Sequence, residues 1–112
     1  MSEPMFIGVD LGGTNVEAAA VRNGKVLATK KKKTRAKKGA EEVIDRIETV
    51  IRKVIKKMDA APSDFEAVCI GAPGVVDIQT GVVREAPNLN WQDVPLAEEL
   101  RERVGMPVLL DN

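Results

Sequence analysis

One carboxylate, two glycines and two polar side chains stand within the short stretch from Asp10 to Asn15, DLGGTN. Gly12 and Gly13 let the backbone approach an anion closely, and successive N–H groups in such a turn form an anion-binding concavity. The Thr14 hydroxyl and the Asn15 amide can each donate a further hydrogen bond. Because the Asp10 carboxylate repels a bare phosphate, the pattern indicates a phosphate with a cation, for which Mg²⁺ held through water is the candidate. From these residues alone, the alternative is a tight turn that binds no ligand.

The glycine loop, by which we mean residues 10–15, matches neither of two common nucleotide-binding motifs. It lacks the Gly-Lys-Ser/Thr ending of a P-loop and the glycine spacing of a dinucleotide-binding loop. A strand rather than a helix is also predicted to follow it. The loop therefore fits a phosphate-binding turn between the two strands of a hairpin.

Short apolar runs around the glycine loop predict three consecutive strands, at residues 5–10, 15–21 and 25–32. Asn23-Gly24 separates the second strand from the third. This dipeptide between two such runs is the strongest short hairpin signal, because both turn residues need a positive φ. The glycine loop therefore joins the first two strands, and the Asn-Gly turn joins the second to the third.

After Gly39 the apolar residues recur with a helical period. They form a single stripe over about four turns, at Val43, Ile44, Ile47, Val50, Ile51, Val54, Ile55 and Met58. Glu41 and Glu42 suit the positive end of the helix dipole, and Lys56 and Lys57 suit the negative end. We expect this helix to cover the strands; a coiled-coil partner is the alternative use of its stripe.

The rest of the chain predicts two more strands and one short helix. FEAVCIG forms a fourth strand, in which we expect Cys69 to be a small buried hydrophobe rather than a nucleophile. A loop region follows, then a helix that begins at Pro95 and ends at Gly105, and a last strand in MPVLLDN. This order of elements predicts a mixed sheet with helices packed on it.

The composition fits one globular domain. Of the 112 residues 44% are hydrophobic and 30% charged, and the 17 basic and 17 acidic side chains leave no net charge. The sequence contains no apolar run long enough for a membrane helix, no signal-peptide pattern, no histidine and only one cysteine. We therefore expect a cytoplasmic protein without a disulfide, and not a polyelectrolyte binder as a whole.

Five sequence blocks follow one another in a specific order: IGVDLGGTN, the hairpin after it, GAPGVVDIQTGVV, APNLNWQDVPL and PVLLDN. Together they resemble the N-terminal lobe of sugar kinases of the ROK family (repressor/open reading frame/kinase), which includes bacterial-type glucokinases. The resemblance implies an α/β, ribonuclease H-like fold of the actin/hexokinase superfamily, with ATP-dependent transfer of phosphate to a hexose hydroxyl between two lobes. We therefore expect residues 1–112 to be the N-terminal lobe of such a two-lobe kinase, with the C-terminal nucleotide-binding lobe absent.

The same resemblance implies roles for individual residues. ATP phosphate binding is implied for Asp10, Gly12, Gly13, Thr14 and Asn15, with Asp10 beside Mg²⁺ through water. Sugar binding is implied for Gly74, Val75, Asn88 and Asn112. We expect Trp91 to be a packing residue. Without the resemblance to the family, the residues Pro73-Gly74 would indicate only a plain turn.

The resemblance also implies that a catalytic group is missing from these residues. In the family, an aspartate that acts as general base directly follows the asparagine matching Asn112. The sequence around Asp77 indicates a turn residue. Successive side chains of a strand point to opposite faces, so Asp111 should point away from the face that Asn112 uses. We therefore expect neither aspartate to replace the missing general base. We expect a truncated domain, inactive by itself, with no zinc site and no cofactor needed for folding; ATP, Mg²⁺ and hexose belong to the intact enzyme.

Two further features leave alternatives open. Residues 30–38, KKKKTRAKK, hold seven basic side chains and could contact nucleic-acid phosphates. They lack interleaved aromatics, so we expect a solvated strand end and no nucleic-acid partner. A lobe separated from its partner exposes apolar surface, so we also expect a homo-oligomer, most simply a dimer. A non-catalytic assembly domain is therefore the alternative function.

Overall fold

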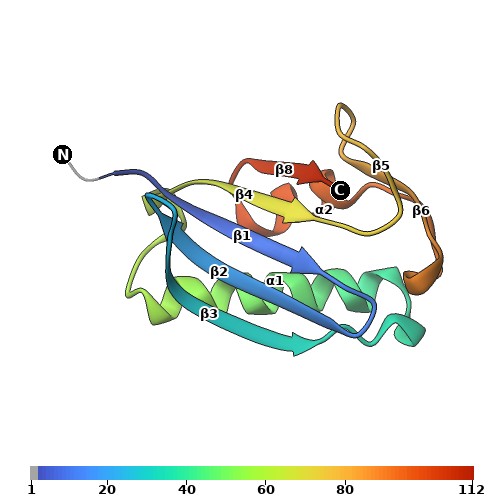
Figure 1. The fold of residues 1–112 in the computed structure, drawn as a ribbon, viewed down its shortest axis with the longest axis horizontal. Coiled ribbons are helices and arrows are strands. Elements are labelled where there is room, and N and C mark those ends of the chain that lie inside the picture. Colours follow the sequence, from blue (N-terminus) through green and yellow to red (C-terminus); the bar gives the residue numbers. More distant parts are fainter. Residues whose placement is uncertain (1–2) are drawn as a thin grey trace.

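The computed structural model describes residues 3–112, so Met1 and Ser2 of the expected domain lie outside the described residues (Figure 1). The first half of the chain forms β1 (Met5–Leu11), β2 (Asn15–Arg22), β3 (Lys25–Lys33), the 3-10 turn η1 (Ala36–Lys38) and α1 (Ala40–Lys57). The second half forms η2 (Pro62–Asp64), β4 (Phe65–Gly71), β5 (Val75–Asp77), β6 (Val82–Ala86), η3 (Pro87–Leu89), β7 (Trp91–Val94), α2 (Leu96–Val104) and β8 (Val108–Asp111).

The main sheet has five strands in the order β3-β2-β1-β4-β8. The β1–β2 and β2–β3 pairs are antiparallel, whereas β4 is parallel to both β1 and β8. Asn23 and Gly24 both have positive φ values, 52° and 75°, as the predicted hairpin turn requires. The predicted mixed sheet is therefore confirmed, together with the Asn-Gly hairpin.

Both long helices lie on the same face of this sheet (Figure 1). The predicted apolar stripe of α1 is buried from Val43 to Ile55, and Met58 packs against the same core just after the helix ends. Its neighbours on β2 include Ala18 and Ala20, both fully buried, and small side chains allow a helix to approach a sheet closely. The helix therefore covers the strands, as predicted, because its stripe and the buried face of β2 are both apolar.

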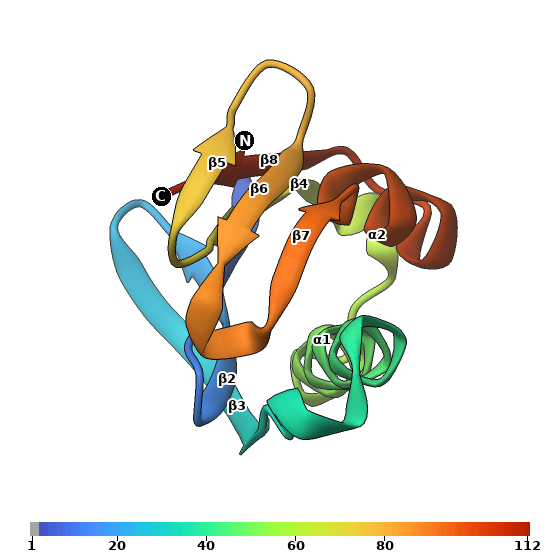
Figure 2. The same ribbon diagram turned by 90° about the vertical axis from the view of Figure 1, so that its right-hand side faces the viewer.

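The segment between the fourth strand and the second helix was predicted to be a loop region, and this prediction was wrong. Residues 75–94 contain a second, three-stranded antiparallel sheet in the order β5-β6-β7, at the end of the main sheet and beside α2 (Figure 2). Its strands have only three, five and four residues, too few to show a period of two in the sequence. Val83, Ala86 and Trp91 nevertheless join the main hydrophobic core, which is what holds the small sheet in place.

The face of the main sheet opposite α1 and α2 carries exposed apolar side chains. By register, Leu109, Cys69 and Gly8 lie side by side across β8, β4 and β1, and Phe6 lies beside Val21 on the next row. Phe6 is 38% exposed and Leu109 is 61% exposed. We call this surface the open face.

Cys69 is exposed on the open face, so the expectation that it is buried was wrong. Val68 and Ile70 face the helices, and the pleat of β4 turns the residue between them to the other side. Partial burial still raises the pKa of the Cys69 thiol. The thiol is therefore mainly protonated at neutral pH, which agrees with the prediction that it is not a nucleophile.

Among residues 3–112, neither helix is long and apolar enough to cross a lipid bilayer.

The turn before β5 generates a stability prediction. Gly74 has a φ of 83°, and a Cβ placed on it would lie 2.0 Å from the Glu85 carbonyl oxygen, a backbone atom that cannot move away cheaply. Gly24 has a similar φ of 75° but nothing within 4 Å of a Cβ, so it is a matched control. We expect Gly24→Ala to cost about 1–2 kcal/mol of unfolding free energy for its left-handed backbone alone. Gly74→Ala should cost clearly more in urea denaturation, and equal losses would contradict the clash.

Candidate functional site

The three mutually parallel strands β1, β4 and β8 end at one edge of the main sheet, as their arrowheads show in Figure 1. Ligands of open α/β sheets bind outside the carboxyl ends of such strands. Three predicted segments follow these ends directly: the glycine loop after β1, residues 72–74 after β4, and Asn112 after β8. The strand order therefore brings together residues that are up to about a hundred positions apart in the sequence.

The glycine loop is a tight turn with free donors. The Gly12 N–H donates to the Asn15 carbonyl at 3.0 Å, which closes the turn. Among the described residues, no protein acceptor takes a hydrogen bond from the N–H of Gly13 or of Thr14. Both residues are exposed, so these two N–H groups are available to an anion.

Thr34 fixes the orientation of this loop. It is the only buried polar residue in the described part of the chain, and its hydroxyl donates to the Gly12 carbonyl at 2.8 Å. Its N–H donates to the Thr14 carbonyl, also at 2.8 Å. These two hydrogen bonds hold the carbonyls of Gly12 and Thr14 toward Thr34. Sequence reasoning missed this residue; the one indication was a lone uncharged β-branched residue inside the basic run.

A row of acidic side chains crosses the open face at the same edge. Asp10 is paired in register with Glu17 on β2 and with Gly71 on β4, and Gly71 is paired with Asp111 on β8. Strands lie about 4.8 Å apart, so Asp10 and Asp111 are roughly 10 Å from each other across the row. Asp10 and Asp111 are both exposed.

These carboxylates do not form a closed metal cage. Among residues 3–112, no three Asp, Glu, His or Cys side chains are close enough together to bind one ion. Mg²⁺ usually keeps several waters and takes only one or two carboxylates from the protein, with phosphate oxygens as further ligands. The exposed Asp10 beside the glycine loop suits that mode of binding.

Asn112 holds the loop that follows β4. Its side-chain amide donates to the carbonyls of Ala72, at 3.2 Å, and Gly74, at 2.6 Å. Its own N–H donates to the Asp111 carboxylate at 2.7 Å. The structure thus brings Asn112 and Gly74 together, with Val75 next to them and 61% exposed.

Asn88 lies with the glycine loop instead. A Cβ placed on Gly13 would be 3.3 Å from the Cβ of Asn88, so only glycine fits there without movement of its neighbour. Both residues line a pocket of about 540 Å³, whose other walls come from Thr14, Lys33, Arg35, Ala36, Lys37 and Lys38. We call this the basic pocket. Gly74, Val75 and Asn112 do not line it, so the predicted site residues fall into two neighbouring groups.

Two predicted non-catalytic roles are confirmed. The Asp77 carboxylate accepts hydrogen bonds from the N–H groups of Gln79, at 3.1 Å, and Thr80, at 3.2 Å, as expected of a turn residue. The Thr80 backbone bond is the main cause that lowers the pKa of Asp77. Trp91 is only 3% exposed and packs in the core, as expected.

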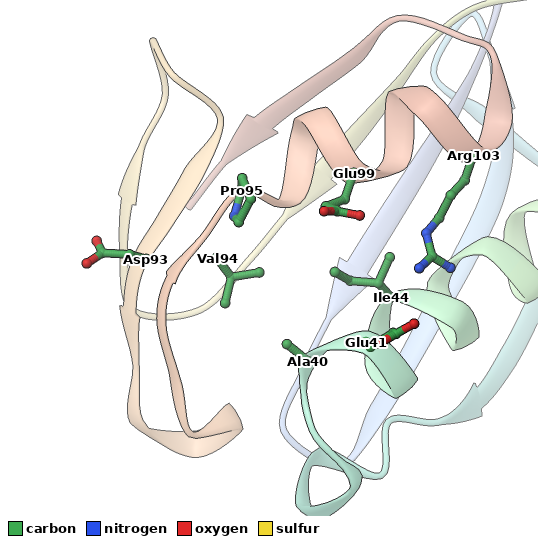
Figure 3. A pocket seen from close by; sticks show the side chains of 8 residues that line it. All are labelled: Ala40, Glu41, Ile44, Asp93, Val94, Pro95, Glu99 and Arg103. Carbon is green, nitrogen blue, oxygen red and sulfur yellow. The ribbon is translucent and has the colours of Figure 1, made fainter.

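A second cavity, of about 380 Å³, lies between α1, β7 and α2 (Figure 3). Its lining includes Glu41, Ile44 and Glu99, and Arg103 points from α2 toward α1. The Arg103 guanidinium donates to the carboxylates of Asp45 and Glu48, and this pairing raises its pKa. The cavity is therefore a crevice between helices joined by an ion pair, and it holds none of the predicted site residues.

Comparison with known proteins agrees with this arrangement. Residues 6–112 match the ROK family. The glucokinase of Thermotoga maritima shares 40% sequence identity with this chain, in an alignment that covers all of this chain and 34% of the glucokinase. A putative xylose repressor of a Caldicellulosiruptor species shares 29% identity, in an alignment that covers 96% of this chain and 27% of the repressor. Among solved structures, the ROK family glucokinase of Streptomyces griseus in complex with glucose and AMPPNP shares 37% sequence identity with this chain and superposes on it with a TM-score of 0.85. This match covers 96% of the present chain and 33% of the glucokinase chain.

These matches confirm the expected actin/hexokinase-like fold. The chain spans about a third of the length of the glucokinases it matches.

Proposed function

This chain belongs to the ROK family, and from that premise we propose that residues 1–112 are the N-terminal, ribonuclease H-like lobe of an ATP-dependent hexose kinase of the glucokinase type. The second lobe of such a kinase would bind the nucleotide from the other side of the cleft. A putative xylose repressor is also among the relatives, so family membership alone does not distinguish a kinase from a regulator. The support for a kinase is therefore the chemistry of the glycine loop.

The single observation that carries the proposal is the pair of unused N–H groups at Gly13 and Thr14, next to the exposed Asp10. N–H groups without a protein acceptor, in an exposed turn, suit phosphate oxygens. We propose that Gly12, Gly13, Thr14 and Asn15 bind the phosphates of ATP. Asp10 would hold Mg²⁺ through water, and the bound ion would neutralise charge on the phosphates.

The sugar would occupy the neighbouring edge of the site. We propose that Gly74, Val75 and Asn112, beyond the ends of β4 and β8, contact the hexose, with Asn88 reaching it from η3. Asn112 is held by its bonds to two carbonyls, so its side chain is preorganised before any ligand arrives. Small errors in such positioning cost a large factor in rate, which explains the value of a fixed amide here.

Titration with ATP–Mg²⁺ tests the phosphate site. We expect the amide resonances of Gly13 and Thr14 to shift first, because their N–H groups would gain an acceptor, whereas adenosine should leave them unchanged. Thr34→Val removes the bond to the Gly12 carbonyl and should weaken binding severalfold, since one such bond contributes about 1 kcal/mol. Thr29→Val, at an exposed position of β3, the strand that ends just before Thr34, is the matched control and should bind as the unchanged chain does. An unperturbed loop would show that the turn is structural only.

We also propose that a polypeptide of these 112 residues does not phosphorylate sugar by itself. Asp77 is engaged in its turn, and Asp111 accepts a hydrogen bond from Asn112, so neither is placed as a free general base. Phosphoryl transfer also depends on positioning from both sides of a cleft. With ATP, Mg²⁺ and glucose we expect no turnover above a protein-free control. Turnover abolished by Asp111→Asn would instead identify Asp111 as the base.

A second candidate function, assembly without catalysis, is favoured by the open face. Phe6, Val26 and Leu109 are 38%, 61% and 61% exposed, and Phe6, Val21 and Val26 are neighbours in register across three strands. Such a contiguous apolar surface marks a contact site in a soluble protein. We propose that these residues pair two copies of the chain when no other segment covers them.

Sedimentation at increasing concentration tests this pairing. We expect dimers, and we expect Leu109→Lys to shift the equilibrium to monomers because it places a charge in the apolar contact. Ile78→Lys is the matched control: Ile78 is 62% exposed but lies in the turn after β5, outside the open face. A chain that stays monomeric at high concentration, or equal effects of the two substitutions, would contradict pairing through the open face.

A further inference from the structure

Arg46 connects α1 with the strand that ends beside the glycine loop. Its Nε donates to the Glu42 carboxylate at 2.9 Å, one turn earlier on the helix. Its Nη1 donates to the carbonyl of Lys33, the last residue of β3, at 3.2 Å. Only 14% of the Arg46 side chain is exposed. The two bonds leave from different nitrogens of one rigid plane, so the position of the guanidinium is fixed from both sides.

The Lys33 carbonyl belongs to the same planar peptide group as the Thr34 N–H. That N–H donates to the Thr14 carbonyl in the glycine loop at 2.8 Å. The peptide is trans, so its carbonyl points the opposite way, outward from β3, which is the edge strand of the main sheet. Arg46 therefore binds one end of a peptide group whose other end binds the glycine loop.

Thr34 then controls a second peptide group, the one between Gly12 and Gly13. Its fully buried hydroxyl donates to the Gly12 carbonyl at 2.8 Å. The Gly13 N–H is on the opposite side of this planar group, so it points away from Thr34. This N–H is one of the two without a protein acceptor in the described part of the chain. The direction of a proposed phosphate donor thus depends on contacts that begin on α1.

We propose that Arg46, held by Glu42, is a positioning residue of the phosphate site. It fixes the peptide group before Thr34, Thr34 fixes the peptide group before Gly13, and the Gly13 N–H is thereby directed at the ligand. The inference rests on the proposed binding of phosphate at the glycine loop. It goes beyond that proposal because it adds a residue of α1 that acts through another side chain.

Arg52 provides a matched comparison on the same helix. Its Nε donates to the Glu48 carboxylate at 2.8 Å, and its Nη2 donates to the Arg103 carbonyl at 2.6 Å. The kinds of bond are therefore the same as for Arg46, but the carbonyl belongs to α2 instead of β3. An exposed ion pair one helical turn apart contributes little by itself. A difference between the two arginines would therefore come from the element that the second bond holds.

Binding of ATP–Mg²⁺ to the full chain, followed by the shifts of the loop amides, tests the proposal. Arg46→Met removes both bonds and keeps an unbranched side chain, and Arg52→Met is the control. We expect Arg46→Met to bind severalfold more weakly, with a loss no larger than that of Thr34→Val. Arg52→Met should bind within about twofold of the unchanged chain. Equal losses in the two arginine variants would overturn the proposal.

Arg46→Lys separates positioning from charge. Lysine keeps the positive charge but has no planar fork to join the Glu42 carboxylate to the Lys33 carbonyl. We therefore expect Arg46→Lys to bind ATP–Mg²⁺ about as weakly as Arg46→Met. Full affinity in Arg46→Lys would overturn the proposal, because attraction between the charge and the phosphates would then be sufficient.

A double-mutant cycle tests whether Arg46 acts through Thr34. Substitutions in one hydrogen-bonded network do not act independently, whereas those at separate sites do. The combined variant, Arg46→Met with Thr34→Val, should therefore lose clearly less affinity than the product of the two single losses. A combined loss equal to that product would overturn the proposed route through Thr34.

Hydrogen exchange without nucleotide separates this inference from the proposed function. The Thr34 N–H should exchange severalfold faster in Arg46→Met, because its peptide group has lost one of two anchors, and at the unchanged rate in Arg52→Met. Normal ATP binding with unaltered Thr34 exchange in Arg46→Met would contradict the role of Arg46 alone. Altered exchange in a chain whose loop amides never respond to ATP–Mg²⁺ would instead contradict the phosphate site. Glu42→Gln, which removes only the partner of Arg46, should change exchange and binding in the same direction and replaces Arg46→Met if that variant does not fold.

Discussion

The parallel pairing of β1, β4 and β8 is the constraint on which the rest of this structure depends. Parallel neighbours need a crossover connection, and such crossovers are almost always right-handed. Both crossovers here run in the same direction across the sheet, from β1 to β4 and from β4 to β8. Equal handedness and equal direction place α1 and α2 on the same face. One sheet face is therefore buried and the other open, and all three strand ends meet at one edge, beside the candidate site.

Much of this arrangement could be predicted from the sequence because its determinants are local. The Asn23-Gly24 turn and the seven buried positions of α1 need only near neighbours in the chain to be recognised. The small sheet β5-β6-β7 could not be predicted, since its strands are held by Trp91 and other residues that pack against distant elements. Cys69 was misplaced for a related reason: an apolar run does not show which of its residues the pleat turns outward.

The candidate site was predictable as a set of residues but not as a geometry. The composition of the glycine loop indicates phosphate from Asp10 to Asn15 alone, whereas the sugar assignments depend on resemblance to a family. Neither shows that Asn88 lies beside Gly13, because that contact joins two turns distant in the sequence. The role of Thr34 was hidden by the charges on either side of it. A short buried side chain in a basic run is recognised only when its partners, the carbonyls of Gly12 and Thr14, are in view.

The bonds of Asn112 have a consequence for the polarity of any interaction at the tip of β8. The side-chain amide of asparagine has two N–H donors and one oxygen acceptor. Both donors are taken, by the carbonyls of Ala72 and Gly74, so only the oxygen remains for a ligand. A hydroxyl that binds the Asn112 side chain must therefore donate its hydrogen to the amide oxygen. An ether oxygen or a fluorine of the same size would meet a lone pair, and this one side chain would discriminate between a free hydroxyl and its alkylated or fluorinated analogue.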